Sequence, residues 1–433
     1  MVYMASKENW GTKLGFVLAT MGAAIGCGNL WRFPYMVGKY GEAAFLFVYV
    51  AIVAFISFPL LTAEVAMGRK TRKDPVGAFQ TLAPGTRWFL GGYLNVAVSF
   101  MWLAYLTPIF GWFLGYFFKI AMGTFKSMPP EKIAVHFPSF IAQGNIVFLL
   151  SLSLVALIVF IVRKGVRQGV EKTNNILMPI LFVILVVLII RALTLPGAAK
   201  GLEFYLKPDF SKLSLEAVLG ALGQALFSVG VAVGVGIVFG SYLPEDNSSI
   251  TRKTAVVCVG DTLVAFLAGL MIFPSVFAFG LEPNSGGGLL FVTLPNVFNQ
   301  LPMGTMIGCA TVLLFMIAML TSQVACFETV VCFMEETLKV ARERAIWILA
   351  ALLCVLIYIN ANFMKIFSIF DYVTSNIFLT GGALLLALFV GWKWKVPAMM
   401  KAASIESGHK TWIILLKYFV PVAILLVWAS WIF

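Results

Sequence analysis

The sequence predicts an all-α polytopic membrane protein, and two features of its composition lead to this fold class. Hydrophobic residues make up 61% of the 433 residues, while charged residues make up only 12%, a balance that soluble proteins do not have. The apolar residues also gather into about eleven stretches of roughly 20 residues, the length that a helix needs to cross a bilayer. Little chain remains for an aqueous domain. This excludes a soluble enzyme, a secreted disulfide scaffold, a disordered chain and, despite a net charge of +12, a nucleic-acid-binding protein.

The apolar stretches place the predicted transmembrane helices in order along the chain. They cover residues 12–35, 42–68, 91–121, 145–162, 174–192, 215–242, 252–280, 303–339, 345–360, 363–392 and 411–433. Two more polar segments, residues 194–214 and 283–302, are predicted to be loops on the outer side. The first stretch begins near Leu14 and is followed by no small-residue cleavage pattern. We therefore expect a membrane helix there rather than a cleaved signal peptide.

Lys and Arg residues are unevenly divided between the two alternating sets of predicted loops. The set on the side of the N-terminus carries most of them, for example around Arg69, Arg163 and Lys393. Because cytoplasmic loops of membrane proteins are enriched in Lys and Arg, we expect a cytoplasmic N-terminus and, with an odd number of helices, a C-terminus outside. The six cysteines all lie in apolar stretches without metal-ligand spacing, and we expect them to be small core residues.

Two of the predicted helices contain glycine-rich runs at mid-membrane depth. Residues 22–29 of the first helix read GAAIGCGN, and residues 228–236 of the sixth helix read SVGVAVGVG. A helix that unwinds in hydrocarbon exposes backbone polar groups, and this is tolerated only where protein, ions or substrate satisfy them. Close helix packing also explains either run alone. Two interrupted helices in corresponding positions, however, are typical of a transporter built from two inverted five-helix repeats.

The repeat pattern predicts four parts of the chain. Residues 1–192 hold the N-terminal tail and the first repeat, and residues 193–213 form an outer connecting loop. Residues 214–393 hold the second repeat, and residues 394–433 hold a cytoplasmic loop and the eleventh helix.

Several longer motifs resemble the neurotransmitter:sodium symporter family, and more narrowly its bacterial amino-acid transporters with the LeuT fold. The motifs are GAAIGCGNLWRFP at residues 22–34, EVAMGR at 64–69, GQ at 223–224, FS at 227–228, GSY at 240–242, FVTLP at 291–295 and LTS at 320–322. The resemblance extends over residues 10–392. It implies the LeuT fold with broken helices 1 and 6, sodium-coupled symport of an amino acid by alternating access, and a multi-pass protein in the cytoplasmic (inner) membrane of a prokaryote. Whether two copies associate as a homodimer stays open.

The resemblance implies two sodium sites, built from the oxygen ligands that a hard cation prefers. Site 1 maps onto Ala24, Asn29, Ser228 and Asp261, and site 2 onto Gly22, Ile25, Ala318, Thr321 and Ser322. Asp261 is an ionisable residue inside a membrane helix, which indicates function by default, although a proton-bearing or hydrogen-bonded packing Asp is the alternative. For Thr321 and Ser322 the alternative is a hydrogen bond to their own helix backbone. Animal members carry Asn at the Asp261 position and use chloride, so we expect that this protein does not require chloride.

The resemblance also implies a site for an amino-acid zwitterion. Backbone N–H groups at the break of the first helix, over Ala24, Gly26, Cys27 and Gly28, attract a carboxylate, while free carbonyls of the sixth helix receive the ammonium group. The remaining substrate-binding positions are Trp102, Phe227, Ser228, Gly230, Val233, Ser322 and Cys326. Leucine-transporting members carry bulkier groups at Gly230 and Val233, so we expect room for a hydrophobic or aromatic side chain, although Trp102 fills part of the space.

One position departs from the family pattern. Counting back from Gly111 and Trp112, the residue at which the family usually has a carboxylate-binding Tyr is Leu106. Tyr105 is one residue earlier and about 100° round the helix. Pro108 lies close enough to change the register. Either Tyr105 takes this role or carboxylate recognition is altered.

Two charge pairs match the gates of the family. Arg32 and Asp371 correspond to the outer pair, and Lys7 and Glu336 to the inner pair, beside Trp10. The family usually has Arg at the Lys7 position, and Lys lacks the bidentate geometry of Arg. A solvated surface pair is the alternative interpretation for the inner residues.

Three further features are typical of the family. Glu64 and Glu328 are expected to be polar connectors inside the bundle. Gly169 and Pro179 enclose nine residues at the start of the fifth helix, a spacing at which some members unwind to let water reach the second sodium site.

Other functions remain to be distinguished. A proton-coupled or sodium-independent permease would share the broken helices, with Asp261 carrying the proton, and a channel or substrate-sensing protein would bind ligand without accumulating it. An enzyme is not expected, because the sequence has no nucleophile and base pair, no phosphate loop and no set of metal-ligating side chains.

Overall fold

The computed structural model describes residues 7–40, 42–126, 128–244, 249–280, 289–299 and 301–429, and within these ranges every regular element is a helix. Nine of the described helical stretches are long and apolar enough to cross a membrane, and a tenth is a pair of helices bent by 51°. The shorter apolar helix α11 (Leu215–Val229) begins a further, interrupted span. This arrangement agrees with the predicted eleven spans. Residues 283–288 and 300 of the predicted outer loop and residues 430–433 at the C-terminus lie outside the described ranges.

The spans consist of one or several helical segments each. In chain order they are α1 (Lys13–Ala24), η1 (Gly28–Arg32) and α2 (Phe33–Tyr40); α3 (Glu42–Ile52), η2 (Val53–Ser57) and α4 (Phe58–Thr71); α6 (Phe89–Ala121); α8 (Gly144–Val162); η3 (Val166–Glu171) and α9 (Lys172–Leu193); α11 and α12 (Val235–Ser241); α13 (Ile250–Ala278); α15 (Gly304–Glu336); α16 (Arg342–Asn362); α17 (Met364–Tyr372), η6 (Val373–Phe378), α18 (Leu379–Leu388) and η7 (Phe389–Trp394); and α20 (His409–Ile413), η8 (Ile414–Phe419) and α21 (Val420–Ala429).

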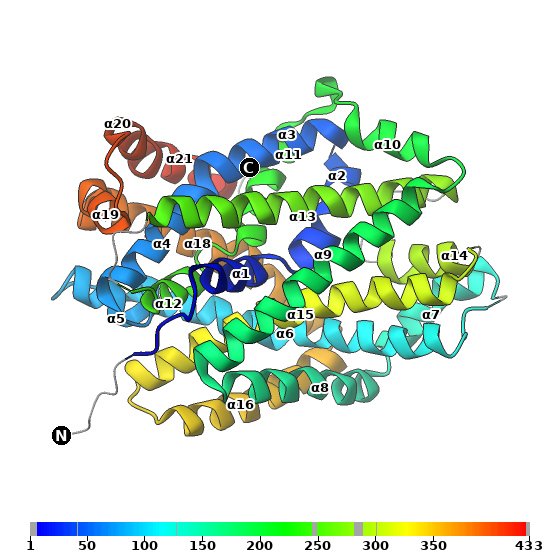
Figure 1. Cartoon of the computed structure of the whole chain (residues 1–433), viewed down its shortest axis with the longest axis horizontal. Coiled ribbons are helices and arrows are strands. Elements are labelled where there is room, and N and C mark those ends of the chain that lie inside the picture. The colour runs from blue at the N-terminus through cyan, green and yellow to red at the C-terminus, as the bar shows by residue number, and fades with distance from the viewer. Residues whose placement is uncertain are drawn as a thin grey trace.

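Short helices cover the two ends of the bundle. Figure 1 shows α5 (Pro75–Leu82) and α19 (Val396–Ala403) at the end where the N-terminus lies, and α7 (Pro130–Ile141), α10 (Ala198–Leu206) and α14 (Leu294–Asn299) at the opposite end. The connections at the N-terminal end are the basic ones. The two sets of loops are therefore separated in space in the way that the charge distribution predicts.

The prediction that residues 194–214 and 283–302 form loops throughout is wrong, because these segments contain α10 and α14. Each of these short helices buries aromatic surface against the bundle. In α10, Tyr205 is fully buried and its hydroxyl donates to the Phe266 carbonyl oxygen of α13, at 3.0 Å. Phe298 of α14 is likewise buried. Packing against the bundle stabilises these two short helices. A hydropathy pattern reports only local composition, so it does not predict this packing.

Both predicted helix breaks are present. In the first span α1 ends at Ala24, and Ile25 has an extended backbone, after which the chain resumes as η1. In the sixth span Gly230, Ala232 and Gly234 all have positive φ, of 71°, 63° and 84°. Glycine adopts this conformation without strain, whereas alanine rarely does. The N–H of Ala232 donates to Glu64 Oε1 at 3.1 Å, so the strained turn is fixed by a buried carboxylate of α4.

Close backbone contact holds the second half of the broken sixth helix against α4. A Cβ atom at Gly68 would overlap the Ile237 carbonyl oxygen, and one at Gly240 would lie 2.5 Å from the Val65 carbonyl oxygen. Beyond α12, the Tyr242 hydroxyl donates to Glu328 Oε1 at 2.7 Å. Glycines on both helices therefore allow a separation that larger residues would prevent.

This packing predicts a specific effect on stability. Gly68→Ala should destabilise the fold by about 1–3 kcal/mol, because the added methyl group overpacks a backbone contact, and the melting temperature in detergent should fall by several degrees. Gly223→Ala is the matched control, because its Cβ would meet nothing within 4 Å and alanine favours helix over glycine by about 1 kcal/mol. A Gly68→Ala protein that melts with or above the control would contradict the packing argument.

Candidate functional site

The breaks of the first and sixth helices meet directly. Gln224 Nε2 of α11 donates to the Gly28 carbonyl oxygen at 2.7 Å, and Asn29 Nδ2 donates to Ser228 Oγ at 2.9 Å. Gln224, Asn29 and Ser228 are all buried. Side chains of one broken helix thus satisfy polar groups at the break of the other, which meets the requirement for unwound backbone inside a membrane.

A buried carboxylate lies where the two breaks meet. Asp261 of α13 is fully buried, and its Oδ1 accepts from Asn29 Nδ2 at 2.7 Å. Ser228 Oγ lies 2.9 Å from Asp261 Oδ2, and Asn29 Nδ2 also donates to the backbone oxygen of Asp261 at 3.0 Å. Asn29 Oδ1 in turn accepts from the Gly26 N–H at 3.1 Å. Three of the predicted site 1 residues therefore form one hydrogen-bonded cluster that includes the break of helix one.

Tyr49 completes this cluster, although the sequence analysis did not identify it. Its hydroxyl lies 3.1 Å from Ser228 Oγ and 3.2 Å from Asp261 Oδ2, and its ring is fully buried. The only sequence signal is a hydroxyl-bearing aromatic residue within the apolar run of α3. The groups that surround the carboxylate are neutral, and the oxygens of Asp261 and Ser228 are the ligand type that a hard monovalent cation prefers. Asn29 presents its Nδ2 to these oxygens, so the chemical fit to a sodium ion rests on the carboxylate and the hydroxyl.

The predicted site 2 residues lie on two facing helices, α1 and α15. Gly26 follows α1, and a Cβ there would lie 3.3 Å from Ser322 Oγ of α15. The hydroxyl of Thr321 bonds to the carbonyl oxygens of Ile317 and Ala318, at 3.2 and 3.0 Å, and that of Ser322 bonds to the Met319 oxygen at 3.1 Å. Both hydroxyls thus donate to the backbone of their own helix, as the alternative interpretation of these residues predicts. A hydroxyl oxygen that donates in this way can still accept or coordinate.

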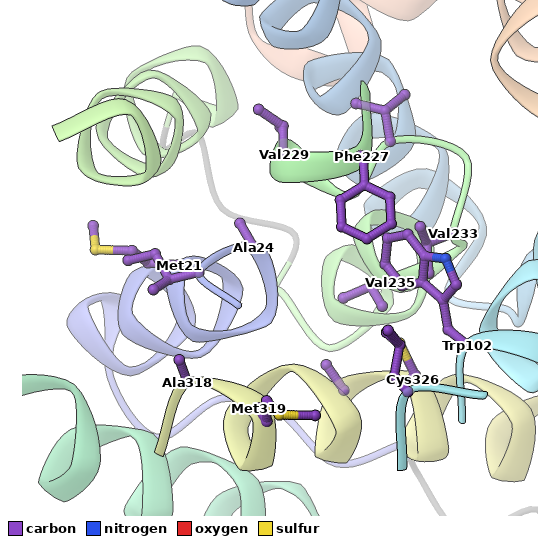
Figure 2. Close-up of a cluster of buried hydrophobic side chains, with 14 of the residues drawn as sticks. Met21, Ala24, Trp102, Phe227, Val229, Val233, Val235, Ala318, Met319 and Cys326 are labelled. Atoms are coloured by element: carbon purple, nitrogen blue, oxygen red, sulfur yellow. The ribbon is translucent and has the colours of Figure 1, made fainter. Parts of the chain in front are cut away.

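A cluster of buried apolar side chains adjoins the breaks (Figure 2). Figure 2 shows the rings of Trp102 and Phe227 side by side, with Val233 and Cys326 next to them; the two ring centroids are 4.9 Å apart. All four side chains are buried, and nothing lies within 4 Å of a Cβ at Gly230. The indole Nε1 of Trp102 is buried without a hydrogen-bond partner. The cluster is therefore apolar and rich in aromatic rings, and it carries one hydrogen-bond donor without a partner.

Tyr105 and Leu106 lie on different faces of α6. The Tyr105 hydroxyl lies 3.4 Å from Ser375 Oγ, which donates to Asp371 Oδ1 at 3.1 Å. Tyr105 therefore takes part in a polar chain with the η6 and α17 segments, near the predicted outer gate. Leu106 is buried and brings no polar group to the site.

The two predicted gate pairs differ in state. Lys7 Nζ and Glu336 Oε1 are 2.5 Å apart, whereas Arg32 and Asp371, both among the described residues, form no ion pair within 4.0 Å. The Arg32 guanidinium instead lies over the Phe227 ring, 4.6 Å from its centroid. The inner pair is closed and the outer pair is not.

Further contacts reinforce the inner side. Glu336 Oε2 accepts from the Asp74 N–H at 2.6 Å, and Trp10 Nε1 donates to the Phe239 carbonyl oxygen at 2.9 Å. Burial disfavours the charge of Lys7, but the neighbouring Cys332 and Glu336 outweigh burial, and the pKa of Lys7 lies above its ordinary value. Lys7 therefore remains a cation and sustains the ion pair.

Glu64 and Glu328 are both fully buried within the bundle, where each connects separate helices. Glu64 joins α4 to the break of helix six through the Ala232 N–H. Glu328 receives two hydrogen bonds from the Arg342 guanidinium, at 2.7 and 3.0 Å, besides that from Tyr242. Neither forms part of the Asp261 cluster.

Comparison with known proteins relates this arrangement to a family. The sequence model of the sodium:neurotransmitter symporter family matches residues 7–129 and 130–433. The sodium-dependent transporter YhdH of Bacillus subtilis is 35% identical over 439 aligned positions, which cover 97% of both chains. A sodium-dependent transporter of Haemophilus influenzae is 33% identical over 452 positions, which cover 99% of this chain and 98% of the relative.

A solved structure matches the whole fold. The crystal structure of MhsT in complex with L-phenylalanine superposes with a TM-score of 0.91 at 37% sequence identity, covering 98% of this chain and all of MhsT. The match confirms the predicted LeuT fold, and the relatives are transporters rather than enzymes. Two broken helices that meet at a buried carboxylate, together with these matches, identify the chain: it belongs to the sodium:neurotransmitter symporter family.

Proposed function

We propose that this protein couples the movement of sodium to the uptake of a hydrophobic or aromatic amino acid. The observation that carries the proposal is the convergence of Asn29, Ser228 and Asp261 at the meeting point of the two helix breaks. An ion held by these oxygens orders both breaks at once. Sodium binding is thereby linked to the shape of the substrate site, and a ligand drives a conformational change only through such differential binding.

Two sodium sites are proposed. Site 1 consists of Asn29, Ser228, Asp261 and the Ala24 carbonyl oxygen, and Tyr49 is added to it as a hydrogen-bonding neighbour. Site 2 consists of the carbonyl oxygens of Gly22, Ile25 and Ala318 with the hydroxyls of Thr321 and Ser322. The carboxylate of Asp261 supplies the negative charge at site 1, which makes chloride unnecessary.

The proposed substrate lies between the breaks. Its carboxylate faces the backbone N–H groups of Cys27 and Gly28, because the Gly26 N–H already donates to Asn29 Oδ1. Its side chain lies among Trp102, Phe227, Val233 and Cys326, which form the proposed side-chain pocket. The structural relative MhsT is described in complex with L-phenylalanine, which supports an aromatic or large apolar side chain here. Because Leu106 has no hydroxyl, carboxylate recognition depends on the backbone and on sodium at site 1.

The proposed transport cycle is alternating access between two five-helix repeats, residues 1–192 and 214–393. Closure of Arg32 onto Asp371 seals the outside, and separation of Lys7 from Glu336 opens the inside. The N-terminus is assigned to the cytoplasm, in the inner membrane of a prokaryote, with the C-terminus outside. The basic loops at the N-terminal end of the bundle support this orientation.

Sodium-driven uptake is the first test. Proteoliposomes with an inward sodium gradient should accumulate labelled phenylalanine or leucine, and replacing external sodium with choline should abolish accumulation. Accumulation that follows a pH gradient without sodium would favour a proton-coupled permease. Binding without accumulation would favour a sensing protein.

Chloride independence tests the role of Asp261. Uptake by the unaltered protein should be the same in chloride and in gluconate, because the buried carboxylate supplies the charge. Asp261→Asn removes that charge and should lower uptake in gluconate by at least about tenfold, or roughly 1.4 kcal/mol, with partial recovery in chloride. Glu216→Gln, which neutralises an exposed carboxylate, is the control. Loss of uptake by the unaltered protein in gluconate would disprove the assignment.

Substrate size tests the pocket. Val233→Phe narrows the pocket and should weaken sodium-dependent binding of phenylalanine by about tenfold or more while sparing alanine, since a misfit in a packed pocket costs about 1–3 kcal/mol. Cys326→Ala widens the pocket and should have the smaller effect on phenylalanine. Melting temperatures without substrate serve as the folding control. Equal effects on phenylalanine and alanine would show that these residues do not line the side-chain pocket.

A further inference from the structure

A stripe of buried residues runs from the end of η3 into α9 and faces the first helix. Glu171, Asn174 and Met178 are buried and recur at intervals of three and four residues, so they lie on one helix face, while the neighbouring Asn175 is exposed. Gly22 of α1 packs on this face, because a Cβ there would overlap Asn174 Oδ1 and would lie 3.2 Å from Met178 Sδ. The first helix therefore rests on oxygen-bearing side chains at this contact.

The two polar residues of the stripe differ in how their oxygens are used. The Glu171 carboxylate accepts from Gly11 N, Thr12 N and Thr12 Oγ1, at 2.7, 3.1 and 2.9 Å. Asn174 Nδ2 donates to the Val170 carbonyl oxygen at 2.9 Å, while Oδ1 is buried without a hydrogen-bond partner. Exchanging the two amide atoms would place Oδ1 against another acceptor. The unpaired oxygen is therefore fixed in its direction, toward Gly22.

An unpaired buried acceptor is destabilising, and its position suggests a function. Gly22 belongs to the proposed site 2, so Asn174 Oδ1 is next to that site on the side of α9. Asn174 also lies between Gly169 and Pro179, where the helix is locally weak. Pro179 has no N–H to donate to the carbonyl group four residues earlier, and η3 (Val166–Glu171) precedes α9 with widened turns.

We propose that Asn174 Oδ1 is a transfer ligand for sodium, which receives the ion from the Gly22 side of site 2 as α1 and α9 separate. This inference rests on the proposed function. An amide oxygen is a suitable ligand for a hard cation, and a neutral ligand binds weakly enough to release it. Glu171 lies three residues closer to the end assigned to the cytoplasm and attracts the ion in that direction. Its hydrogen bonds to Gly11 and Thr12 hold the N-terminus of α1.

Adjacent asparagines provide the test. On this proposal, sodium on the cytoplasmic side of proteoliposomes should inhibit uptake, because it occupies the release route. Asn174→Asp adds a charge to the proposed ligand, so inhibition should occur at about tenfold lower sodium, a factor that corresponds to roughly 1.4 kcal/mol. Asn175→Asp adds the same charge one residue away on the exposed face and should leave the inhibition unchanged. Asn174→Val should slow uptake while the sodium dependence of substrate binding at equilibrium stays normal.

Three results would decide against the inference. Equal inhibition in Asn174→Asp and Asn175→Asp would mean that only the local potential matters. Unchanged inhibition in Asn174→Asp would mean that the oxygen does not meet the ion, and this comparison holds even if Asn174→Val fails to fold. If the unaltered protein shows no sodium-driven uptake, the proposed function itself is refuted. If uptake is normal but Asn174→Asp and Asn175→Asp are inhibited at the same sodium concentration, only the transfer ligand is refuted.

Discussion

Unwound backbone inside a membrane is the constraint on which the rest of the structure depends. Every polar group released at the two breaks needs a partner in a region without bulk water. Gln224 donates to the Gly28 carbonyl oxygen, and Glu64 accepts from the Ala232 N–H. Because these partners come from another helix, each break is held by a different part of the chain. The hydrogen bonds that satisfy the two breaks therefore also link the first broken helix to α11 and the second to α4.

The same constraint explains why the buried acidic residues occupy separate places. Asp261 is surrounded by hydrogen bonds from Asn29, Ser228 and Tyr49, all of them neutral groups, so a cation is the natural complement to its charge. Glu328 is instead paired with the Arg342 guanidinium. A carboxylate that already has a permanent cationic partner gains little from an ion in transit. Of these two sites, only that of Asp261 combines a buried charge with neutral partners that an ion can replace.

The features that depend on local composition, such as the helix breaks and the membrane spans, could be predicted from the sequence. The glycine runs predicted both breaks, and apolar length predicted most spans within a few residues. The fifth span, however, begins at Val166 rather than at residue 174, and the first extends to Tyr40 rather than to residue 35. Features that arise from distant contacts were missed. Tyr49 is 179 residues from Ser228 and 212 from Asp261, so nothing in its own segment indicates that it joins the cluster. The helices α10 and α14 were missed for the same reason, since packing on the bundle stabilises them.

The inner and outer gate pairs differ in the number of protein contacts that surround them. At the inner side, Lys7 is paired with Glu336, Trp10 bonds to the Phe239 carbonyl oxygen, and the Glu171 carboxylate caps the start of α1. At the outer side, Arg32 rests on the Phe227 ring and Asp371 is hydrogen-bonded to Ser375. Protein contacts alone thus favour a closed inside, and they do not join the outer pair. Closing the outer pair and loosening the inner one needs free energy from outside these contacts. Ligands supply it only if they bind the two states differently. An ion at the proposed site 1 would do so, because the residues of that site come from both broken helices.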